Sequence, residues 1–276
     1  MNISRIAILG TGSMGGAILA GLIKSGFEPS NISVTTNSDA SATALAEQFG
    51  VLTFALENGE DANQMAVAGA DVILVGVKPA YVTEVLADVA DSLNDDALVV
   101  SVAAGITTAA MQAVLPADVA VVRAMPNTPA IVGLAVTGVA PGSRASAENV
   151  ETAKQLFETV GKVIVLGEDK IDELGTISGS GPAYVFYLVE KLTEAAKAHG
   201  FSDADAALMV NETFLGAAKL LVESGKSPQE LRKQVTSPNG TTERAIARFD
   251  QTDLTAMFVE GTQAALARSR ELASGK

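Results

Sequence analysis

The chain has 276 residues, 48% of them apolar, with a net charge of −13, no cysteine and one histidine. A chain of this length can bury a large core, and its acidity makes nucleic acid an unfavourable partner. The lack of cysteine excludes disulfides, thiolate catalysis and cysteine-ligated metals, and a single histidine cannot form a metal-binding cluster.

The first residues contain neither a basic segment nor a long apolar run. We therefore expect no signal peptide and a cytoplasmic protein. Apolar runs elsewhere are short and are interrupted by Gly, Pro or charged residues, so we expect no transmembrane helix and no membrane partner.

Short β-branched runs alternate with helical patterns in the first half of the chain. The runs predict strands over residues 5–9, 32–36, 72–77, 97–102 and 120–123. The helical patterns between them cover residues 14–25, 40–49, 80–92 and 107–114. Continuous apolar strands that alternate with helices predict a parallel, doubly wound α/β sheet with helices on both faces. A strand over 135–140, a helix over 147–160 and a strand over 163–166 are expected to extend this sheet.

After Gly167 the sequence shows helix signals and no convincing strand. Pro182, Ser202, Ser227 and Asp253 stand where helix starts favour proline and short polar side chains. Helices are predicted over residues 182–199, 203–224, 228–235, 241–249 and 252–273.

These helices are rich in Ala, Gly and Leu, as residues 203–224 illustrate. Such side chains allow close packing, but a bundle of this size is thin, so a second copy is expected to complete its core. The single histidine, His199, ends the first of these helices, and a polar helix terminus explains it better than catalysis.

A glycine-rich turn, Gly10-Thr11-Gly12-Ser13-Met14-Gly15, joins the first predicted strand to the first predicted helix. In this G-x-G-x-x-G pattern the first glycine permits a tight turn, the second lets the backbone approach a pyrophosphate, and the third lets helix and strand pack closely. Free N–H groups at the helix start favour phosphate. We therefore predict a dinucleotide-binding Rossmann domain over residues 1–167, with these six residues at the cofactor, and an all-helical domain over 168–276.

The end of the second predicted strand bears on the choice between NAD and NADP. An NAD enzyme usually has Asp or Glu there, which accepts a hydrogen bond from the ribose. This strand ends in Thr35-Thr36-Asn37-Ser38, with no acid before Asp39 and no Arg or Lys to neutralise a phosphate. Because hydroxyl and amide groups can donate to a 2′-phosphate, we predict NADPH as the preferred cofactor, with NADH as the alternative.

Two further loops follow strands of the predicted sheet, Val77-Lys78-Pro79 and Ala103-Ala104-Gly105. Ligands bind outside the carboxyl ends of parallel strands, so we expect both loops to contact the cofactor. Lys78 precedes a proline and should be extended. A solvated loop lysine and a direct role in substrate chemistry both remain open for it.

The segment Ser237-Pro238-Asn239-Gly240-Thr241-Thr242 combines two turn signals with a helix start. Unpaired N–H groups at such a start can hold a carboxylate. From the residues alone, helix capping explains the segment better than ligand binding.

Six segments, taken in order and spacing, resemble the pyrroline-5-carboxylate reductase family over essentially the whole chain. They are the glycine-rich turn, Val77 to Pro79, Val99 to Gly105, Arg123-Ala124-Met125-Pro126-Asn127-Thr128-Pro129, Ser178-Gly179-Ser180-Gly181-Pro182-Ala183-Tyr184 and Ser237 to Thr242. The glycine turn is shared by many dehydrogenases, whereas the last three in combination are specific. The resemblance implies NAD(P)H-dependent reduction of the cyclic imine 1-pyrroline-5-carboxylate to L-proline, the last step of proline biosynthesis.

The resemblance also implies an assembly and substrate contacts. A Rossmann domain is followed by a helical dimerisation domain, two of which interlock, with the active site at their interface. The expected assembly is a homodimer or a larger oligomer built from dimers. The hydroxyl of Thr242 matches the group that hydrogen-bonds the imine nitrogen, and Ser237, Gly240 and Thr241 match the loop that holds the substrate carboxylate.

For the cofactor, the resemblance places Thr36 and Ser38 at the adenosine ribose or its phosphate, and Asn58 at a further contact. The chain departs from the family at Asn239, which replaces the usual glycine but tolerates a left-handed backbone. Gln234 stands where some members have a cofactor-contacting Asn, and the second strand lacks the Arg of some relatives.

Two other classes of protein compete with this interpretation. A β-hydroxyacid dehydrogenase would use a lysine of the helical half as its acid, but Lys191, Lys197 and Lys219 lie on predicted solvated helix faces. A redox-sensing dinucleotide-binding protein would not turn over, and the intact segment 237–242 argues against it. A protonated imine is already electrophilic, so its reduction needs neither metal nor cysteine.

Overall fold

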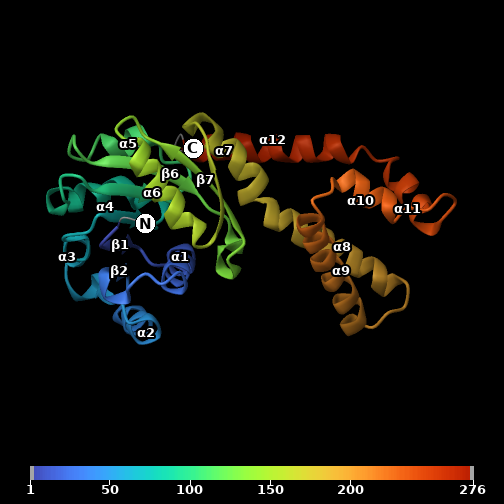
Figure 1. Ribbon diagram of the computed structural model, residues 1–276, viewed down its shortest axis with the longest axis horizontal. Coiled ribbons are helices and arrows are strands. Elements are labelled where there is room, and N and C mark those ends of the chain that lie inside the picture. Colours follow the sequence, from blue (N-terminus) through green and yellow to red (C-terminus); the bar gives the residue numbers. More distant parts are fainter. Residues whose placement is uncertain (1–2, 274–276) are drawn as a thin grey trace. The chain divides into compact units, whose positions relative to one another are not determined.

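The structure is a computed structural model that describes residues 3–273 (Figure 1). The chain divides into two compact units. The first contains the residues up to Ser180 and those from Leu266 onward, and the second is Gly181–Ala265.

An eight-stranded sheet forms the centre of the first unit, in the order β3-β2-β1-β4-β5-β6-β7-β8. The strands from β3 to β6 are parallel, and their order reverses at β1, as in a doubly wound dinucleotide-binding sheet. The strands are β1 (Ile6–Leu9), β2 (Ile32–Thr36), β3 (Leu52–Ala55), β4 (Val72–Val75), β5 (Leu98–Ser101), β6 (Ala120–Met125), β7 (Ala135–Pro141) and β8 (Gly161–Val165).

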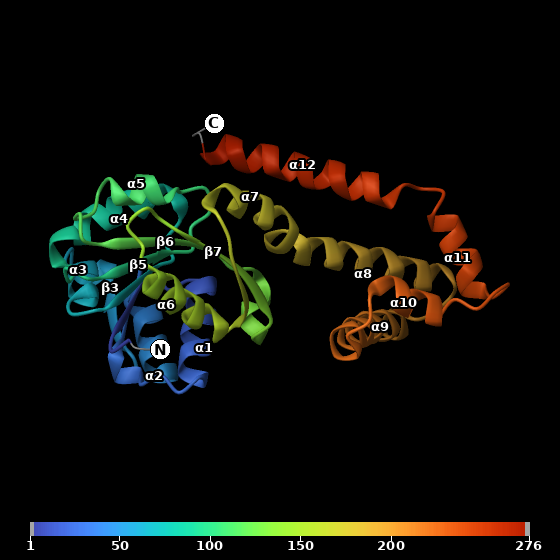
Figure 2. The same ribbon diagram turned by 45° about the horizontal axis from the view of Figure 1, so that its top comes forward.

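Helices cover both faces of this sheet, as the fold class predicted (Figure 2). One face packs against α1 and α6 through Leu19 and Phe157, and the other against α3 and α4 through Val67 and Leu86, all fully buried. The helices are α1 (Ser13–Lys24), α2 (Asp39–Phe49), α3 (Ala62–Val67), α4 (Val82–Val89), α5 (Thr108–Gln112) and α6 (Ala147–Glu158).

The predicted strands agree with the structure to within two residues at each end, but β3 and α3 were not predicted. Strand β3 is short, lies at the edge of the sheet and exposes Leu52, so its sequence lacks a continuous apolar run. Strand β7 extends the sheet as expected, but it runs antiparallel to β6. The connection between these two strands holds only the 3₁₀ segment Thr128–Val132, which is too short for a parallel crossover.

Helical turns also follow β8 within the first unit. They are η6 (Glu168–Lys170), α7 (Ile171–Leu174) and the π-helix η7 (Gly175–Gly179), which begin earlier than the first helix predicted for this half. Gly138 of β7 makes room for them, since a Cβ atom there would lie 2.9 Å from Leu174 Cδ1 and 3.3 Å from Ile171 Cδ1.

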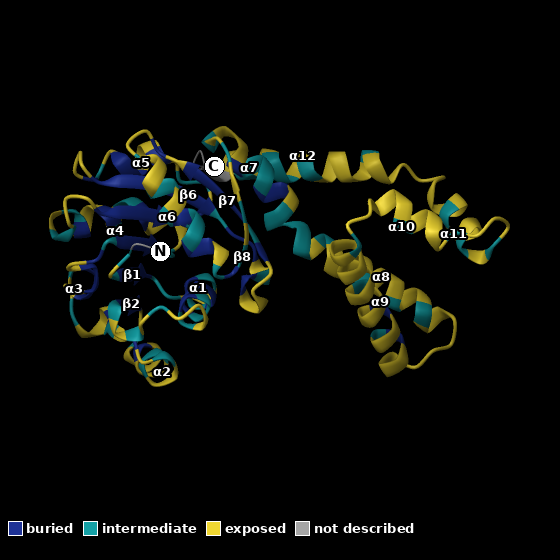
Figure 3. Ribbon diagram, viewed as in Figure 1, coloured by how far each residue is buried: buried dark blue, intermediate teal, exposed yellow. Residues whose placement is uncertain are grey.

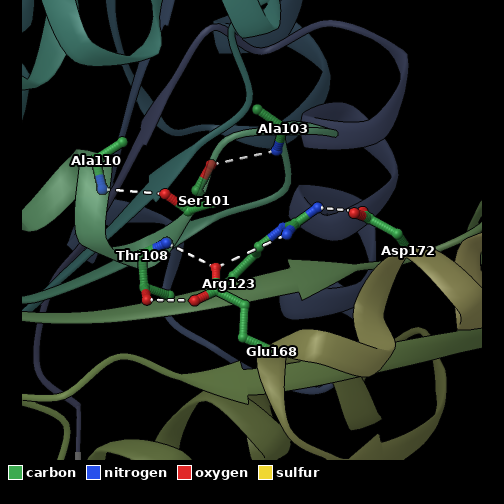
Figure 4. Close-up of polar contacts among 8 residues, drawn as sticks. Ser101, Ala103, Thr108, Ala110, Arg123, Glu168 and Asp172 are labelled. Carbon is green, nitrogen blue, oxygen red and sulfur yellow. Dashed lines mark hydrogen bonds and ion pairs between the residues drawn. The ribbon is translucent and has the colours of Figure 1, made fainter. Parts of the chain in front are cut away.

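A buried arginine fixes these turns to the sheet (Figure 4). Arg123 of β6 is 3% exposed, and its Nη2 lies 2.6 Å from Asp172 Oδ1. Its Nη1 lies 3.7 Å from Glu168 Oε1. The Glu168 carboxylate in turn accepts hydrogen bonds from the N–H and the hydroxyl of Thr108, at 2.7 and 2.6 Å. Four elements are thereby tied together around one guanidinium.

The second unit is helical, as predicted, with α8 (Gly181–Ala198), α9 (Asp203–Ser224), α10 (Pro228–Gln234), α11 (Thr241–Phe249) and most of α12 (Leu254–Ala273). The Ser202 hydroxyl caps α9, and Ser227 forms a capping box with Glu230. Asp253 Oδ1 accepts a hydrogen bond from Ala256 N–H at the start of α12. His199 follows α8 directly, which confirms its place at a helix end.

Buried residues are scarce in the second unit, whose ribbon is mostly coloured as exposed (Figure 3). Among its described residues only Ala206 and Val210 are buried. Large apolar side chains of α8 and α9 are instead exposed, including Phe186 and Leu215. No helix within residues 3–273 is long and apolar enough to cross a membrane.

Candidate cofactor and substrate sites

In the turn after β1, the presence of glycine has a different geometric explanation at each of three positions. Gly10 has φ +79°, and a Cβ atom there would lie 2.6 Å from Val77 Cγ1. A Cβ atom on Gly15 would lie 3.3 Å from both Gly10 O and Ile8 Cγ2, so the helix packs closely on its strand. At Gly12 a Cβ atom would meet no described atom within 4 Å. The open space beside Gly12 fits the approach of a pyrophosphate.

Strand β2 holds this turn in place. Thr11 N–H donates to Thr35 O at 2.9 Å, and Gly10 N–H donates to Thr35 Oγ1 at 3.0 Å. The first helical bond of α1 runs from Gly16 N–H to Gly12 O. Among the described residues, the N–H groups of residues 13–15 therefore have no acceptor, and they fit a bound anion.

The loops after β4 and β5 lie beside the glycine turn at the same edge of the sheet. A Cβ atom on Gly76 would lie 2.9 Å from Gly10 O, which shows how closely the loop Val77–Pro79 approaches. Lys78 is extended, with φ −60° and ψ 145°, as its place before proline predicted, and it is exposed. Ala103 N–H donates to Ser101 Oγ, and Gly105 has φ +76°.

The end of β2 lies next to a carboxylate from another part of the chain, in addition to Asp39 from its own sequence. The Thr36 hydroxyl donates to Ser38 O at 2.9 Å, and the Ser38 hydroxyl accepts from Ser41 N–H as the cap of α2. Asp39 N–H donates to Glu57 Oε1 at 2.5 Å. Glu57 comes from the turn after β3, a strand that was not predicted, so no local signal in the sequence connected it with β2.

The loop at 237–240 has the backbone predicted for a turn with Asn in place of Gly. Asn239 has φ +60°, which confirms the left-handed conformation. Gly240 N–H donates to Ser237 O at 3.0 Å. A Cβ atom on Gly240 would lie 2.9 Å from that same oxygen, so only glycine fits there.

Helix α11 then begins with unpaired donors. Its first helical bond runs from Arg244 N–H to Gly240 O, and no side chain caps the helix. Among the described residues, the N–H groups of Thr241, Thr242 and Glu243 have no acceptor. The Glu243 carboxylate accepts instead from Asn239 N–H at 2.8 Å. Three free donors in one turn suit a small carboxylate.

Comparison with known proteins places this chain in a family. The family model described as pyrroline-5-carboxylate reductase dimerisation matches residues 168–272. A second model, described as NADP oxidoreductase, coenzyme F420-dependent, matches residues 5–105. The pyrroline-5-carboxylate reductase of Corynebacterium melassecola is 39% identical over 272 residues, with 98% of each chain covered. The chain belongs to the pyrroline-5-carboxylate reductase family.

Other members of the pyrroline-5-carboxylate reductase family are similarly close. The protein of that name from Escherichia coli K12 is 36% identical, with 97% of this chain and 98% of the relative covered. A solved pyrroline-5-carboxylate reductase from Coxiella burnetii is 37% identical and has a TM-score of 0.92, with 98% and 99% of the two chains covered. Membership of this family confirms the predicted fold class and makes the chain an NAD(P)-dependent oxidoreductase.

The lysines required by the competing β-hydroxyacid dehydrogenase interpretation are all exposed and paired with acids. Lys191 lies 2.7 Å from Glu190 and 3.0 Å from Glu194, and hydrogen bonds to these carboxylates raise its pKa. Lys197 lies 2.8 Å from Asp203, and Lys219 lies 3.8 Å from Glu223. A lysine with a raised pKa is a weak proton donor, so Lys191 does not suit the role of acid.

Proposed function

We propose that the chain reduces the C=N bond of 1-pyrroline-5-carboxylate to L-proline with NADPH as the preferred cofactor, in the last step of proline biosynthesis. The observation that carries the proposal is the loop at 237–242. Its left-handed Asn239 and the N–H groups of Thr241, Thr242 and Glu243, which have no acceptor among the described residues, support a carboxylate-binding turn at this position.

In this proposal the substrate carboxylate is held by Ser237, Gly240 and Thr241. The hydroxyl of Thr242, a half-buried residue, hydrogen-bonds the ring nitrogen and orients the C=N bond. Orientation is the main task of these residues, because a protonated imine is electrophilic without further activation. The proton that ends on nitrogen is already present in that protonated substrate.

The cofactor is proposed to bind along the carboxyl ends of β1, β2, β4 and β5. When bound, it supplies the hydride that adds to the imine carbon. The description of the family model that matches residues 5–105, an NADP oxidoreductase, supports NADPH. The residues proposed to contact it are Gly10, Thr11, Gly12, Ser13, Met14, Gly15, Thr36, Ser38, Asn58, Val77, Lys78, Pro79, Ala103, Ala104 and Gly105.

The proposed assembly is a homodimer, or a larger oligomer built from dimers, through the helical domain at 168–276. The description of the family model over residues 168–272 and the exposed apolar side chains of α8 and α9 support it. The functional division at 167/168, with the dinucleotide-binding domain before it, and a cytoplasmic location are part of the same proposal.

A substrate panel tests the proposed activity. Purified protein is mixed with NADPH and either 1-pyrroline-5-carboxylate or a set of β-ketoacids, and the loss of NADPH absorbance is followed. We expect turnover with the cyclic imine and none with the ketoacids. Turnover with a ketoacid would favour the dehydrogenase class, and tight NADPH binding without any turnover would favour a redox sensor.

A further inference from the structure

A side-chain carboxylate occupies the N-terminus of α2, where β2 ends. Glu57 Oε1 accepts the hydrogen bond of Asp39 N–H at 2.5 Å. Asp39 is the first residue of α2, and its own carboxylate accepts from Asn58 Nδ2 at 2.8 Å. Two negative charges therefore face the start of a helix that would otherwise offer its N–H groups to an external anion.

The backbone holds Glu57 in this place. Strands β2 and β3 are parallel, with Thr36 beside Ala55, so the turns that follow them are adjacent. Glu57 N–H donates to Asn37 O at 3.3 Å. Together with the bonds made by the Glu57 and Asn58 side chains, three hydrogen bonds tie the turn after β3 to residues 37–39.

This corner is where a Rossmann domain distinguishes its two nicotinamide cofactors. The 2′ position of the adenosine ribose lies at the end of the second strand, and NADP(H) carries a phosphate there while NAD(H) carries a hydroxyl. Between Lys24 and Lys78 the sequence contains no Lys or Arg. No cation of β2, α2 or β3 therefore neutralises the phosphate, and the carboxylate of Glu57 opposes it.

We infer that Glu57 is a specificity-determining residue that narrows the preference for NADPH over NADH. The inference rests on the proposed function only in assuming that a nicotinamide dinucleotide binds at this sheet edge. The Glu57 carboxylate disfavours the phosphate, and the hydroxyl protons of Thr36 and Ser38 are already donated to Ser38 O and Ser41 Oγ. The ribose hydroxyl of NADH carries no charge, so the Glu57 carboxylate does not repel it and can accept its hydrogen bond, as the amide oxygen of a glutamine also can.

Calorimetric titration of the full-length protein with NADPH and with NADH tests this inference. The variant is Glu57→Gln, which keeps an acceptor for Asp39 N–H and removes the charge. Glu57 is exposed and the variant keeps its hydrogen bond to Asp39 N–H, so we expect the fold to be retained. We expect the Kd for NADPH to fall about tenfold, because juxtaposed like charges are strongly unfavourable, and the Kd for NADH to stay within about twofold.

The matched control is Glu47→Gln, which removes one exposed carboxylate from α2, the helix whose first N–H group donates to Glu57. Residue 47 lies about 12 Å along the helix axis from residue 39, beyond the Debye length of roughly 8 Å at physiological salt. Both Kd values should stay at their wild-type levels in this control.

An NADPH Kd in Glu57→Gln that is unchanged or higher would overturn the inference. Equal weakening of both cofactors would mean that Glu57 only holds the loop, and this would overturn it too. Because the readout is binding, a protein that failed to reduce pyrroline-5-carboxylate could still confirm the role of Glu57, which separates this test from that of the proposed function.

Discussion

Thr242 is the second residue of α11 and is half-buried. No side chain caps the N-terminus of α11. Replacing it with alanine removes the proposed hydrogen bond to the substrate nitrogen. A hydrogen bond to a charged group is worth about 1.5–3 kcal/mol. Since about 1.4 kcal/mol is a factor of ten in rate, kcat/KM for the imine should fall tenfold or more, as steady-state kinetics would measure.

The affinity for NADPH and the melting temperature should change little in Thr242→Ala. Ser202→Ala provides the contrast, because the Ser202 hydroxyl does cap its helix, and loss of such a cap costs about 1 kcal/mol of stability. That variant should melt earlier while its kcat/KM stays normal. Near-normal kcat/KM in Thr242→Ala would remove this residue from the substrate site.

A substitution at Ser38 tests the predicted preference for NADPH over NADH. Its hydroxyl caps α2, and aspartate caps helices equally well, so Ser38→Asp adds a charge without losing the cap. The new carboxylate should repel a 2′-phosphate, and the ratio of kcat/KM for NADPH to that for NADH should fall about tenfold. A wild-type protein whose kcat/KM is already higher with NADH would show the NADPH assignment to be wrong.

At the scale of elements, sequence patterns located most helices and strands because their apolar periodicity is strong. The glycine turn, the extended Lys78 and the left-handed Asn239 followed from local backbone chemistry, and the structure has all three. Strand β3 was missed because it is short and half-exposed. The carboxylate of Glu57 at the end of β2 depends on that strand, so the sequence could not place it.

The sequence also gives no sign that Arg123 contacts Glu168 and Asp172, or that Glu168 contacts Thr108. These four residues lie far apart in the chain and are brought together only by the fold. Removal of the Arg123 side chain should lower the stability of the fold. Arg123→Ala leaves the partly buried carboxylates of Glu168 and Asp172 without their cation, which should lower the free energy of unfolding by about 3 kcal/mol.

Urea unfolding of Arg123→Ala, followed by circular dichroism, measures this loss. Arg268→Ala is its control, because Arg268 pairs with Glu271 on an exposed face of α12, and such surface pairs contribute about 0–1 kcal/mol. Equal stability of the two variants would contradict the structural role of Arg123.

At the scale of the whole molecule, the second unit has few buried residues, so we expect it to need a further surface to complete its core. Ala206 and Val210 are its only buried residues among those described, whereas side chains such as Phe186 and Leu215 are exposed. Burial of such side chains against a second copy would supply the missing core. Sedimentation velocity at low protein concentration should therefore show dimers or larger species. A folded, active monomer would refute the proposed assembly.

The stoichiometry of the reaction shows whether this chain reduces the imine to L-proline. Full-length protein is incubated with NADPH and 1-pyrroline-5-carboxylate, and NADPH loss and L-proline formation are measured in the same sample. Reduction of the ring imine predicts one L-proline for each NADPH oxidised, with both rates depressed together in Thr242→Ala. Binding of NADPH without formation of L-proline would contradict the assignment of this chain as an imine reductase.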